Sequence, residues 1–389
     1  MRAGLACLIL AYVLSQFYRA IMAVLTPALV QDLGMTSDDL AWASQLWFLG
    51  FAAMQLPVGW ALDKLGPRRT AAPLLYAAAA GAALFATATG PMGVILGMAL
   101  MGVGCAPALM ATYYLYARAF PTAVFGTFAG AVSGLGALGN VAAALPFAWV
   151  VGELGWRSSM GALAALSLAI ALACTALIRD PARAEGPQEG SILDLLRTPS
   201  LWPIFAMMAV CYYPAAALRD LWVGPYARDV FGAGAERIGW LTLAMGLAMG
   251  LGNFLYGQFD RFHDRRKAII LAGNLVCAAF LVALGLSPDP GEATAVALLV
   301  GIGLFGTSFP LILSYGKGRL PKPLLGRGVT LLNFFGIGAT ALAQVSTGEI
   351  FAAMPHDPAA ARFAPVFLFF GLTLLAGLAA YALGRDRSR

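Results

Sequence analysis

The chain has 389 residues, of which 60% are apolar and only 11% are charged. Soluble domains carry about 25% charged residues, so this composition excludes a soluble enzyme or a soluble binding module. The formal net charge of +6 does not indicate a nucleic-acid partner, because the basic residues lie in short segments between apolar runs. The five cysteines lie within apolar runs without a C-x-x-C spacing, which predicts free, buried thiols. We expect no cofactor.

Apolar runs of about 20 residues follow one another along nearly the whole chain, and each can cross the ~30 Å of hydrocarbon in a bilayer. The predicted fold class is therefore an all-α membrane protein with twelve transmembrane helices. The first run continues past Arg19 to Val30 without a small-residue cleavage site, so we interpret it as a span and not as a signal peptide. The predicted spans are 5–30, 40–62, 70–89, 92–115, 122–150, 158–178, 201–226, 238–259, 268–286, 293–314, 328–350 and 363–384.

The basic residues are distributed unequally between the two sides of the predicted membrane. If the N-terminus is cytoplasmic, most of the 25 basic residues fall in the cytoplasmic segments. Cytoplasmic loops carry an excess of Lys and Arg in membrane proteins. The sequence therefore predicts that both termini are cytoplasmic.

The longest polar stretch divides the chain into two parts of six spans each. It predicts an N-terminal half at 1–178, a cytoplasmic linker at 179–200 and a C-terminal half at 201–389. The halves resemble repeats, because Asp260 and Arg261 occupy the place in the second half that Asp63 occupies in the first. In this second copy, Tyr256 replaces a glycine at the position of Gly59, and His263 replaces a glycine at the position of Gly66.

A charged turn between the second and third spans has the pattern G-x-x-x-D-K-x-G-x-R-R. Its first glycine permits close approach of another helix, and its Gly-Pro pair ends one helix and turns the chain. The pattern resembles the loop between the second and third helices of the major facilitator superfamily. The residues that we expect to control conformational exchange are Gly59, Asp63, Lys64, Gly66, Arg68 and Arg69, together with Asp260 and Arg261 of the second half.

This resemblance implies a carrier of the bacterial inner membrane whose two six-helix halves alternate access to a site near the midplane. It implies a transporter and not an enzyme, and the spans contain no clustered carboxylates that would form a catalytic site.

Two positions depart from the family pattern. Met98 stands where an arginine associated with proton coupling is often found, which leaves the coupling ion open. Leu135 stands where the antiporter motif has a proline, which weakens an efflux hypothesis.

Charged residues inside spans are the best indication of function, because each costs about 2.5–3.5 kcal/mol at mid-bilayer even on the mildest scale. Arg19 in the first span and Arg219 in the seventh are therefore candidate substrate contacts. The alternatives are a structural arginine that bonds backbone carbonyls and, for Arg219, a plain interfacial pair with Asp220. Adjacent residues do not share a helix face, so Arg219 and Asp220 need not pair. The other candidates for substrate binding are Tyr18, Tyr113, Asn140, Tyr213, Met245, Met249, Asn253 and Asn333.

Met245, Met249 and Asn253 form one stripe along the eighth span. Thioethers are soft ligands suited to Cu(I), so the two methionines are candidate metal ligands, and core packing is the alternative. The tyrosines compete with this hypothesis, because their rings and hydroxyls suit a flat, polar organic solute.

Three segments resemble a proteobacterial importer branch of the superfamily that includes copper importers and riboflavin importers: Ser15–Arg19, Trp47–Arg69 and Gly102–Pro107. The copper members are similar in carrying a Met-x-x-x-Met pair, which this chain has. They also carry a His-x-x-x-Met pair, which this chain lacks, since His263 and His356 are followed four residues later by Lys and Ala.

The sequence thus predicts a secondary transporter that imports a small solute, with a copper ion and a riboflavin-like compound both left open. The alternatives are proton-coupled efflux of small organic molecules and uptake of a small anion through Arg19 and Arg219. A channel is disfavoured because no filter-like segment is repeated. The expected partners are the lipid bilayer and a small-molecule or ion substrate, with no nucleic acid, and the expected state is a monomer.

Overall fold

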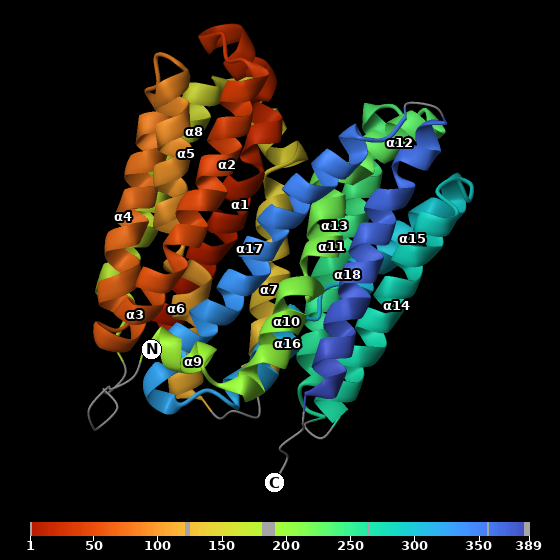
Figure 1. The fold of residues 1–389 in the computed structure, drawn as a ribbon. Helices are drawn as coiled ribbons and strands as arrows, with labels where there is room; N and C mark the ends of the chain where they lie inside the picture. The colour runs from red at the N-terminus through yellow and green to blue at the C-terminus, as the bar shows by residue number, and fades with distance from the viewer. Residues whose placement is uncertain (1, 121–124, 181–190, 263–264, 356–357, 385–389) are drawn as a thin grey trace. The chain divides into compact units, whose positions relative to one another are not determined.

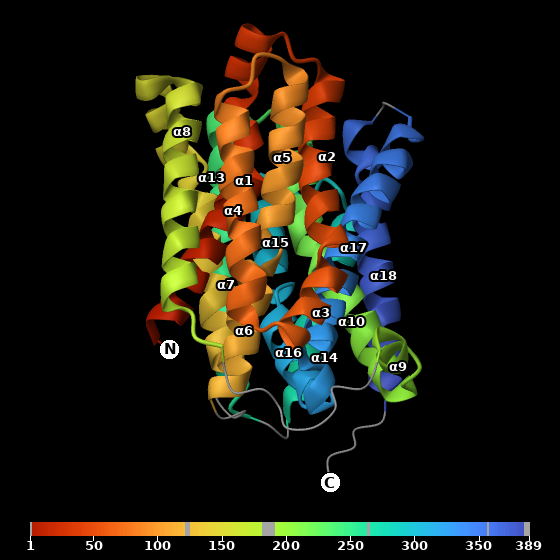
Figure 2. The same cartoon turned by 90° about the vertical axis from the view of Figure 1, so that its left-hand side faces the viewer.

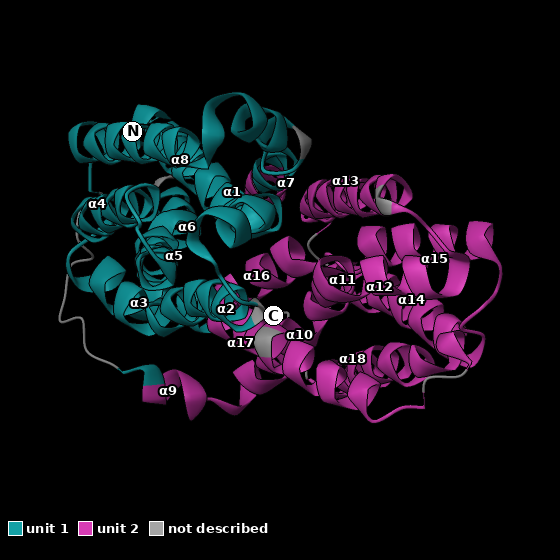
Figure 3. Cartoon of the chain, turned by 90° about the horizontal axis from the view of Figure 1, so that it is seen from above, with its two compact units in different colours: residues 1–121, 135–192, 320–331 teal, residues 122–134, 193–319, 332–389 magenta. Residues whose placement is uncertain are grey.

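The computed structural model describes residues 2–120, 125–180, 191–262, 265–355 and 358–384, and the regular structure within these ranges is entirely helical. The chain forms two compact units (Figure 3). Unit 1 holds residues 1–121, 135–192 and 320–331, and unit 2 holds residues 122–134, 193–319 and 332–389. Each unit thus contains one short segment from the opposite part of the sequence. The predicted boundary at 179–200 stays a prediction, and residues 181–190 of that linker lie outside the described ranges.

Unit 1 is a bundle in which α4 packs against α5 and α8, α2 packs against α5, and α1 packs against α6 and α8. Figures 1 and 2 show these helices side by side in two perpendicular views. Its helices are α1 (Arg2–Leu33), α2 (Ser37–Ala53), α3 (Gln55–Lys64), α4 (Pro67–Ala86), α5 (Pro91–Cys105), α6 (Pro107–Ala119) and α8 (Leu145–Leu177), with the later part of α7 (Phe125–Ala142) and the first residues of α17 (Leu325–Ala352).

Unit 2 is a second bundle, in which α14 packs between α15 and α18, α13 packs against α15, and α10 packs against α18. Its helices are α9 (Ile192–Leu196), α10 (Trp202–Cys211), α11 (Tyr213–Ala217), α12 (Val223–Phe231), α13 (Ala235–Phe259), α14 (Arg266–Leu286), α15 (Glu292–Phe305), α16 (Phe309–Lys317) and α18 (Ala364–Leu383), with the first part of α7 and most of α17. Short helical turns join them: η2 (Pro199–Leu201), η3 (Leu218–Trp222) and η6 (Ala359–Arg362), while η5 (Lys322–Leu324) belongs to unit 1.

Helix boundaries follow ordinary capping chemistry. Thr36 caps α2 through a capping box, since its side chain accepts from the N–H of Asp39 while the Asp39 carboxylate accepts from the N–H of Thr36. These hydrogen bonds lower the pKa of the exposed Asp39 carboxyl. Gly66 precedes α4 with a φ of 86°, a backbone conformation that glycine adopts without steric cost. The predicted Gly-Pro stop between the second and third spans is therefore confirmed.

Eleven helical segments within the described ranges are long and apolar enough to cross a membrane. The predicted second span, 40–62, is not among them, and it is divided at Met54 into α2, of 17 residues, and α3, of 10 residues. The membrane-helix architecture is thus confirmed, whereas the count of twelve spans and the cytoplasmic position of the termini remain predictions.

Several predicted spans are interrupted or shifted. The fourth is divided at Ala106 between α5 and α6, and the tenth between α15 and α16, where proline occupies the first turn of the following helix. The fifth was predicted to run to residue 150, but α7 ends at Ala142 and α8 begins in front of Pro146. Proline lacks the N–H that a continuing helix needs and clashes with the preceding turn. It therefore ends α7 early, and α8 then turns at Gly155, which has a φ of 75°.

Glycines allow the backbones of neighbouring helices to approach closely within each unit. A Cβ on Gly102 of α5 would lie 2.1 Å from the carbonyl oxygen of Trp47 in α2, and one on Gly104 would lie 2.3 Å from the N of Ala78 in α4. In unit 2, a Cβ on Gly130 of α7 would lie 2.6 Å from the Cα of Gly257 in α13. Gly130 and Gly257 thus bring the backbones of α7 and α13 into close contact.

We predict that Gly102→Ala destabilises the protein, because the added methyl group overlaps backbone atoms of α2 that cannot rotate away. Overpacking of this kind costs about 1–3 kcal/mol, so the thermal midpoint in detergent should fall. Gly161→Ala in α8 is the matched control, since a Cβ there meets no atom within 4 Å and alanine favours the helix by up to about 1 kcal/mol. An equal midpoint for the two variants would contradict this packing argument.

Candidate functional site

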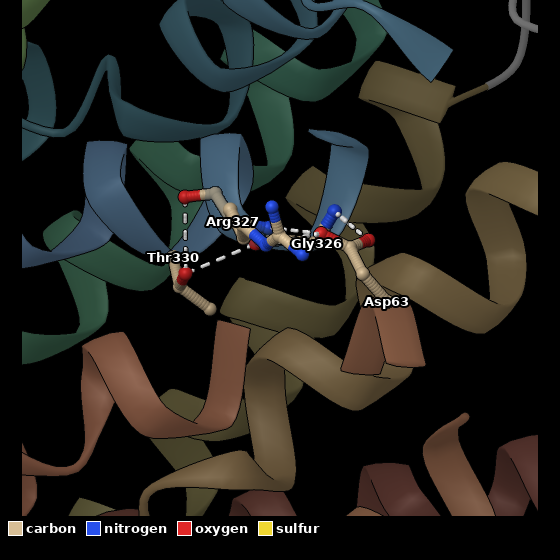
Figure 4. Close-up of polar contacts among 4 residues, drawn as sticks. All are labelled: Asp63, Gly326, Arg327 and Thr330. Atoms are coloured by element: carbon tan, nitrogen blue, oxygen red, sulfur yellow. Dashed lines mark hydrogen bonds and ion pairs between the residues drawn. The ribbon is translucent and has the colours of Figure 1, made fainter. Parts of the chain in front are cut away.

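Asp63 lies at the end of α3 and caps the N-terminus of α17. Its Oδ1 accepts from the N–H of Gly326 at 2.7 Å, and its Oδ2 accepts from the N–H of Arg327 at 3.0 Å. Figure 4 shows the carboxylate facing these two backbone groups. The side chain of Asp63 is fully buried, and the Nε of Arg327 lies 3.6 Å from its Oδ2. We call these three residues the Asp63 cap.

Two glycines make this contact possible. A Cβ on Gly59 would lie 2.0 Å from the Oγ1 of Thr330, and a Cβ on Gly326 would lie 2.6 Å from the Oδ1 of Asp63. The first turn of α17 leaves N–H groups without helical partners and carries a partial positive charge. The buried carboxylate satisfies two of these donors and faces the favourable end of the helix dipole.

The remaining residues of the predicted loop have separate roles in the local structure. The backbone N–H of Arg68 donates to the Oδ1 of Asp180 at 2.7 Å, so Asp180 caps α4. The side chains of Arg68 and Arg69 are exposed, and that of Lys64 is half-buried. Sequence reasoning missed Arg327 as the partner of Asp63 and Asp180 as the cap of α4, because only the fold brings these two residues to the loop.

Unit 2 contains a corresponding arrangement at Asp260. Its Oδ2 accepts from the N–H of Gly126 at the start of α7, at 2.7 Å, and its Oδ1 lies 2.7 Å from the Nε of Arg266. We call these three residues the Asp260 cap. The repeat inferred from the sequence thus extends to the bonding of the two aspartates. Arg261 lies over the ring of Phe262, and His263 lies outside the described residues, as does His356.

The predicted substrate residues of unit 1 differ in accessibility. Tyr18 and Tyr113 are fully buried, and the hydroxyl of Tyr18 is hydrogen-bonded to Ser167 and donates to the carbonyl of Leu163. Tyr18 is therefore held by α8 and has a structural role in this arrangement. Arg19 is half-buried, and its Cζ lies 5.0 Å from the centroid of the Phe48 ring. Asn140, near the end of α7, is also half-buried.

In unit 2, Arg219 lies in η3, a π-helical turn. Such turns occur frequently at functional sites. The side chain of Arg219 is 19% exposed, its Nη1 lies 3.8 Å from the Oδ1 of Asp220, and its Nε is buried without a hydrogen-bond partner. The ion pair between Arg219 and Asp220, which the sequence left as an alternative, is therefore present. Its distance lies at the long end of the range for ion pairs. Gly246 of α13 lies beside the guanidinium, because a Cβ there would be 3.3 Å from the Nε.

The other predicted residues of unit 2 lie in its interior. Tyr213 is buried and its hydroxyl donates to Thr373, and Asn333 is buried in α17. Met245 is fully buried with its Cγ close to Gly303 of α15. Met249 is 5% exposed, and its carbonyl accepts from the Nδ2 of Asn253 at 3.0 Å.

The two candidate metal ligands, Met245 and Met249, lie in α13. Within the described residues, no group of three or more His, Cys, Asp or Glu side chains is arranged to hold a metal ion. Met245 packs between α13 and α15 as a core residue does. Copper ligation by Met245 and Met249 stays a prediction.

Eleven membrane-length helical segments within the described residues define a multi-helix membrane protein. The chain belongs to the major facilitator superfamily, whose family model matches residues 8–336. Two curated proteins are similar to the chain in sequence. The chain is 20% identical over 328 residues, covering 78% of this chain and 75% of the other, to the "Probable sulfoacetate transporter SauU" of Cupriavidus necator. It is 31% identical over 186 residues, 46% of this chain and 45% of the other, to the "Transcription regulatory protein OpdE" of Pseudomonas aeruginosa.

Solved structures of the superfamily share the fold. The transporter FucP aligns with a TM-score of 0.79 at 16% identity, over 98% of both chains. The proton:xylose symporter XylE aligns with a TM-score of 0.77 at 12% identity, over 98% of this chain and 95% of the other. The human organic anion transporter MFSD10 aligns with a TM-score of 0.76 at 14% identity, over 98% and 99%. These likenesses concern the fold alone.

We predict that Asp63→Asn lowers the transport rate and leaves the apparent substrate affinity nearly unchanged. The amide removes the charge that faces Arg327 and the N-terminus of α17, and it turns an NH2 group toward one of two backbone donors. Transport kinetics in proteoliposomes would measure this, with Asp38→Asn, an exposed carboxylate in the first turn of α2, as the control. A large rise in KM at normal turnover would place Asp63 in substrate binding instead.

The copper hypothesis makes its own prediction. Replacing Met245 and Met249 with leucine conserves volume and apolarity, so it should cost less than about 1.5 kcal/mol of stability per site, but it removes both thioether ligands. Copper accumulation in cells should then nearly vanish at equal protein level if these residues bind the ion. Unchanged copper accumulation in the double variant would exclude them as ligands.

Proposed function

We propose that the chain is a secondary carrier that imports a small organic anion, such as a sulfonate or carboxylate, by alternating access. The observation that carries this proposal is the state of Arg219. The guanidinium lies within an apolar membrane-length segment, and its Nε is buried without a hydrogen-bond partner. A buried charge in such a segment is costly unless a partner compensates it. The compensation from Asp220, at 3.8 Å and with a side chain 31% exposed, is weak.

The chemistry of arginine indicates the class of ligand. A guanidinium presents donors in a planar fork that matches the oxygens of a carboxylate or sulfonate, and it stays protonated at every physiological pH. The π-helical turn displaces Arg219 from regular helix spacing, and Gly246 leaves room beside its Nε. These features suit binding of one anionic group to Arg219.

Two further observations support an anionic substrate. Unit 1 also holds a half-buried arginine in its first helix, Arg19, whose Cζ lies over the ring of Phe48. A relative that covers most of the chain is named for the transport of sulfoacetate, a small organic anion. Uptake, and not efflux, is favoured by Leu135 at the position of the antiporter proline.

The copper and riboflavin hypotheses have less support from the side chains on which they depend. Met245 is fully buried against α15, as a packing residue would be. Tyr113 is fully buried and Tyr213 is 4% exposed with its hydroxyl bonded to Thr373. Neither ring offers an open face for stacking an aromatic vitamin. An organic anion is therefore the substrate class that we propose.

Transport into proteoliposomes tests this proposal. We expect labelled sulfoacetate or a related small anion to enter, and a panel containing xylose, fucose, riboflavin and Cu(I) to enter less, in assays with and without a pH gradient. Arg219→Gln should raise KM about 10- to 100-fold, the loss expected for charge-assisted hydrogen bonds of about 1.5–3 kcal/mol.

The matched control is Arg228→Gln, because the Arg228 side chain is 66% exposed and already paired with Asp229. It should leave KM unchanged. Arg219→Lys should restore only part of the affinity, since an ammonium is not a planar fork. Wild-type kinetics for Arg219→Gln, or the absence of uptake for every anion in the panel, would refute the proposal.

A further inference from the structure

Among the described residues of unit 2, one group of buried charges carries more positive than negative charge. Asp260 is fully buried and is held by the N–H of Gly126 and by Arg266. Lys317, at the end of α16, is 9% exposed, and its Nζ lies 4.0 Å from the centroid of the Phe125 ring, in the first turn of α7. The charged groups that act on Lys317 are Asp260 and Arg266. Two cations therefore share one carboxylate.

Hydrogen-bond donors in this cluster remain unused. The Nζ of Lys317 and the Nη2 of Arg266 are both buried and lack a hydrogen-bond partner. The Oδ2 of Asp260 accepts from the N–H of Gly126 at 2.7 Å, and its Oδ1 lies 2.7 Å from the Nε of Arg266, which donates to the backbone carbonyl of Asp260 at 3.2 Å. A buried donor without an acceptor costs about 1–3 kcal/mol, and more when it is charged. The cluster thus holds two such donors within reach of one carboxylate.

The surrounding helix ends do not cancel the excess charge. The N-termini of α7, at Phe125, and of α14, at Arg266, both begin at this cluster, and each contributes about half a positive charge. The C-terminus of α16 at Lys317 contributes about half a negative charge. The sum over these described groups remains positive, as at the helix N-termini that bind anions in other proteins.

We propose that Lys317 and Arg266, together with the N-terminus of α7, form a binding site for one phosphate-type oxyanion, either as the free ion or on a lipid headgroup. Lysine and arginine both bind phosphate oxygens, through a point charge and a planar fork respectively. Lys317 and Arg266 are each 9% exposed as residues, while the Nζ and the Nη2 themselves are buried. This site involves none of the residues assigned to the transported substrate, so it stands or falls independently of the proposed function.

The test measures the thermal midpoint of the full-length protein in phosphatidylcholine nanodiscs, in gluconate buffer at constant ionic strength. Inorganic phosphate is titrated in one arm, and phosphatidylglycerol replaces part of the lipid in the other. A ligand that binds only the folded state should raise Tm saturably, by roughly 3–5 °C at ~100-fold excess over Kd. A rise in the first arm identifies the free ion, and a rise only in the second identifies the headgroup.

Two variants separate this site from general salt effects. Lys317→Met keeps the length of the side chain and removes the charge, so it should abolish the rise, and without ligand it should melt above the wild type because an uncompensated buried cation is gone. Arg319→Met is the matched control: this neighbouring guanidinium lies over Tyr315, and its loss should leave the rise intact.

Lys317→Gln takes the place of Lys317→Met if the methionine variant fails to insert. The proposal is overturned if the wild type responds in neither arm, which would indicate an uncharged lysine. An equal rise in the wild type and in the Lys317 variant would overturn it as well.

Discussion

A carboxylate buried in a protein without access to water requires donors on its oxygens, and this requirement organises both units. Asp63 meets it with two N–H groups in the first turn of α17, and the Oδ2 of Asp260 meets it with the N–H of Gly126 in the first turn of α7. Each helix thereby has a partner at its start, where helices lack internal ones. The close approach also excludes side chains, which accounts for glycine at Gly59 and Gly326 and, in the corresponding region of unit 2, at Gly130 and Gly257.

The interrupted helices show the same requirement for hydrogen-bond partners, here at backbone carbonyls that the breaks leave without a helical donor. Where α5 ends, Ala106 has a carbonyl that accepts from the Nε2 of the buried Gln55 at 3.5 Å. Where α15 ends, the carbonyl of Phe305 accepts from the hydroxyl of Tyr256 at 3.0 Å. Non-helical backbone at membrane depth is tolerated only where protein groups satisfy it. Gln55 and Tyr256 are therefore partners of these breaks, and Tyr256 in place of a glycine has a structural function.

The sequence was sufficient to predict what depends on local pattern, namely the apolar spans, the loop around Asp63 and its degraded repeat at Asp260. It did not predict the interruption of the second and fourth spans or the end of α7 at Ala142, because apolar runs continue through these positions and only single prolines indicate the breaks. It also missed the partners of the aspartates. Gly326 lies 263 residues from Asp63, and no periodicity in one sequence indicates which of many distant helix starts will meet a given carboxylate.

The buried cations of the two units differ in how far the protein itself compensates them. Arg327 and Arg266 each lie against a fully buried carboxylate, at 3.6 and 2.7 Å, and these pairs fix helix ends. Arg219 has only a partly exposed carboxylate at 3.8 Å, and the Nζ of Lys317 has no hydrogen-bond acceptor among the described residues. An uncompensated buried charge is costly, and this cost is the observation on which both proposed sites rest, a transported anion at Arg219 and a bound oxyanion at Lys317.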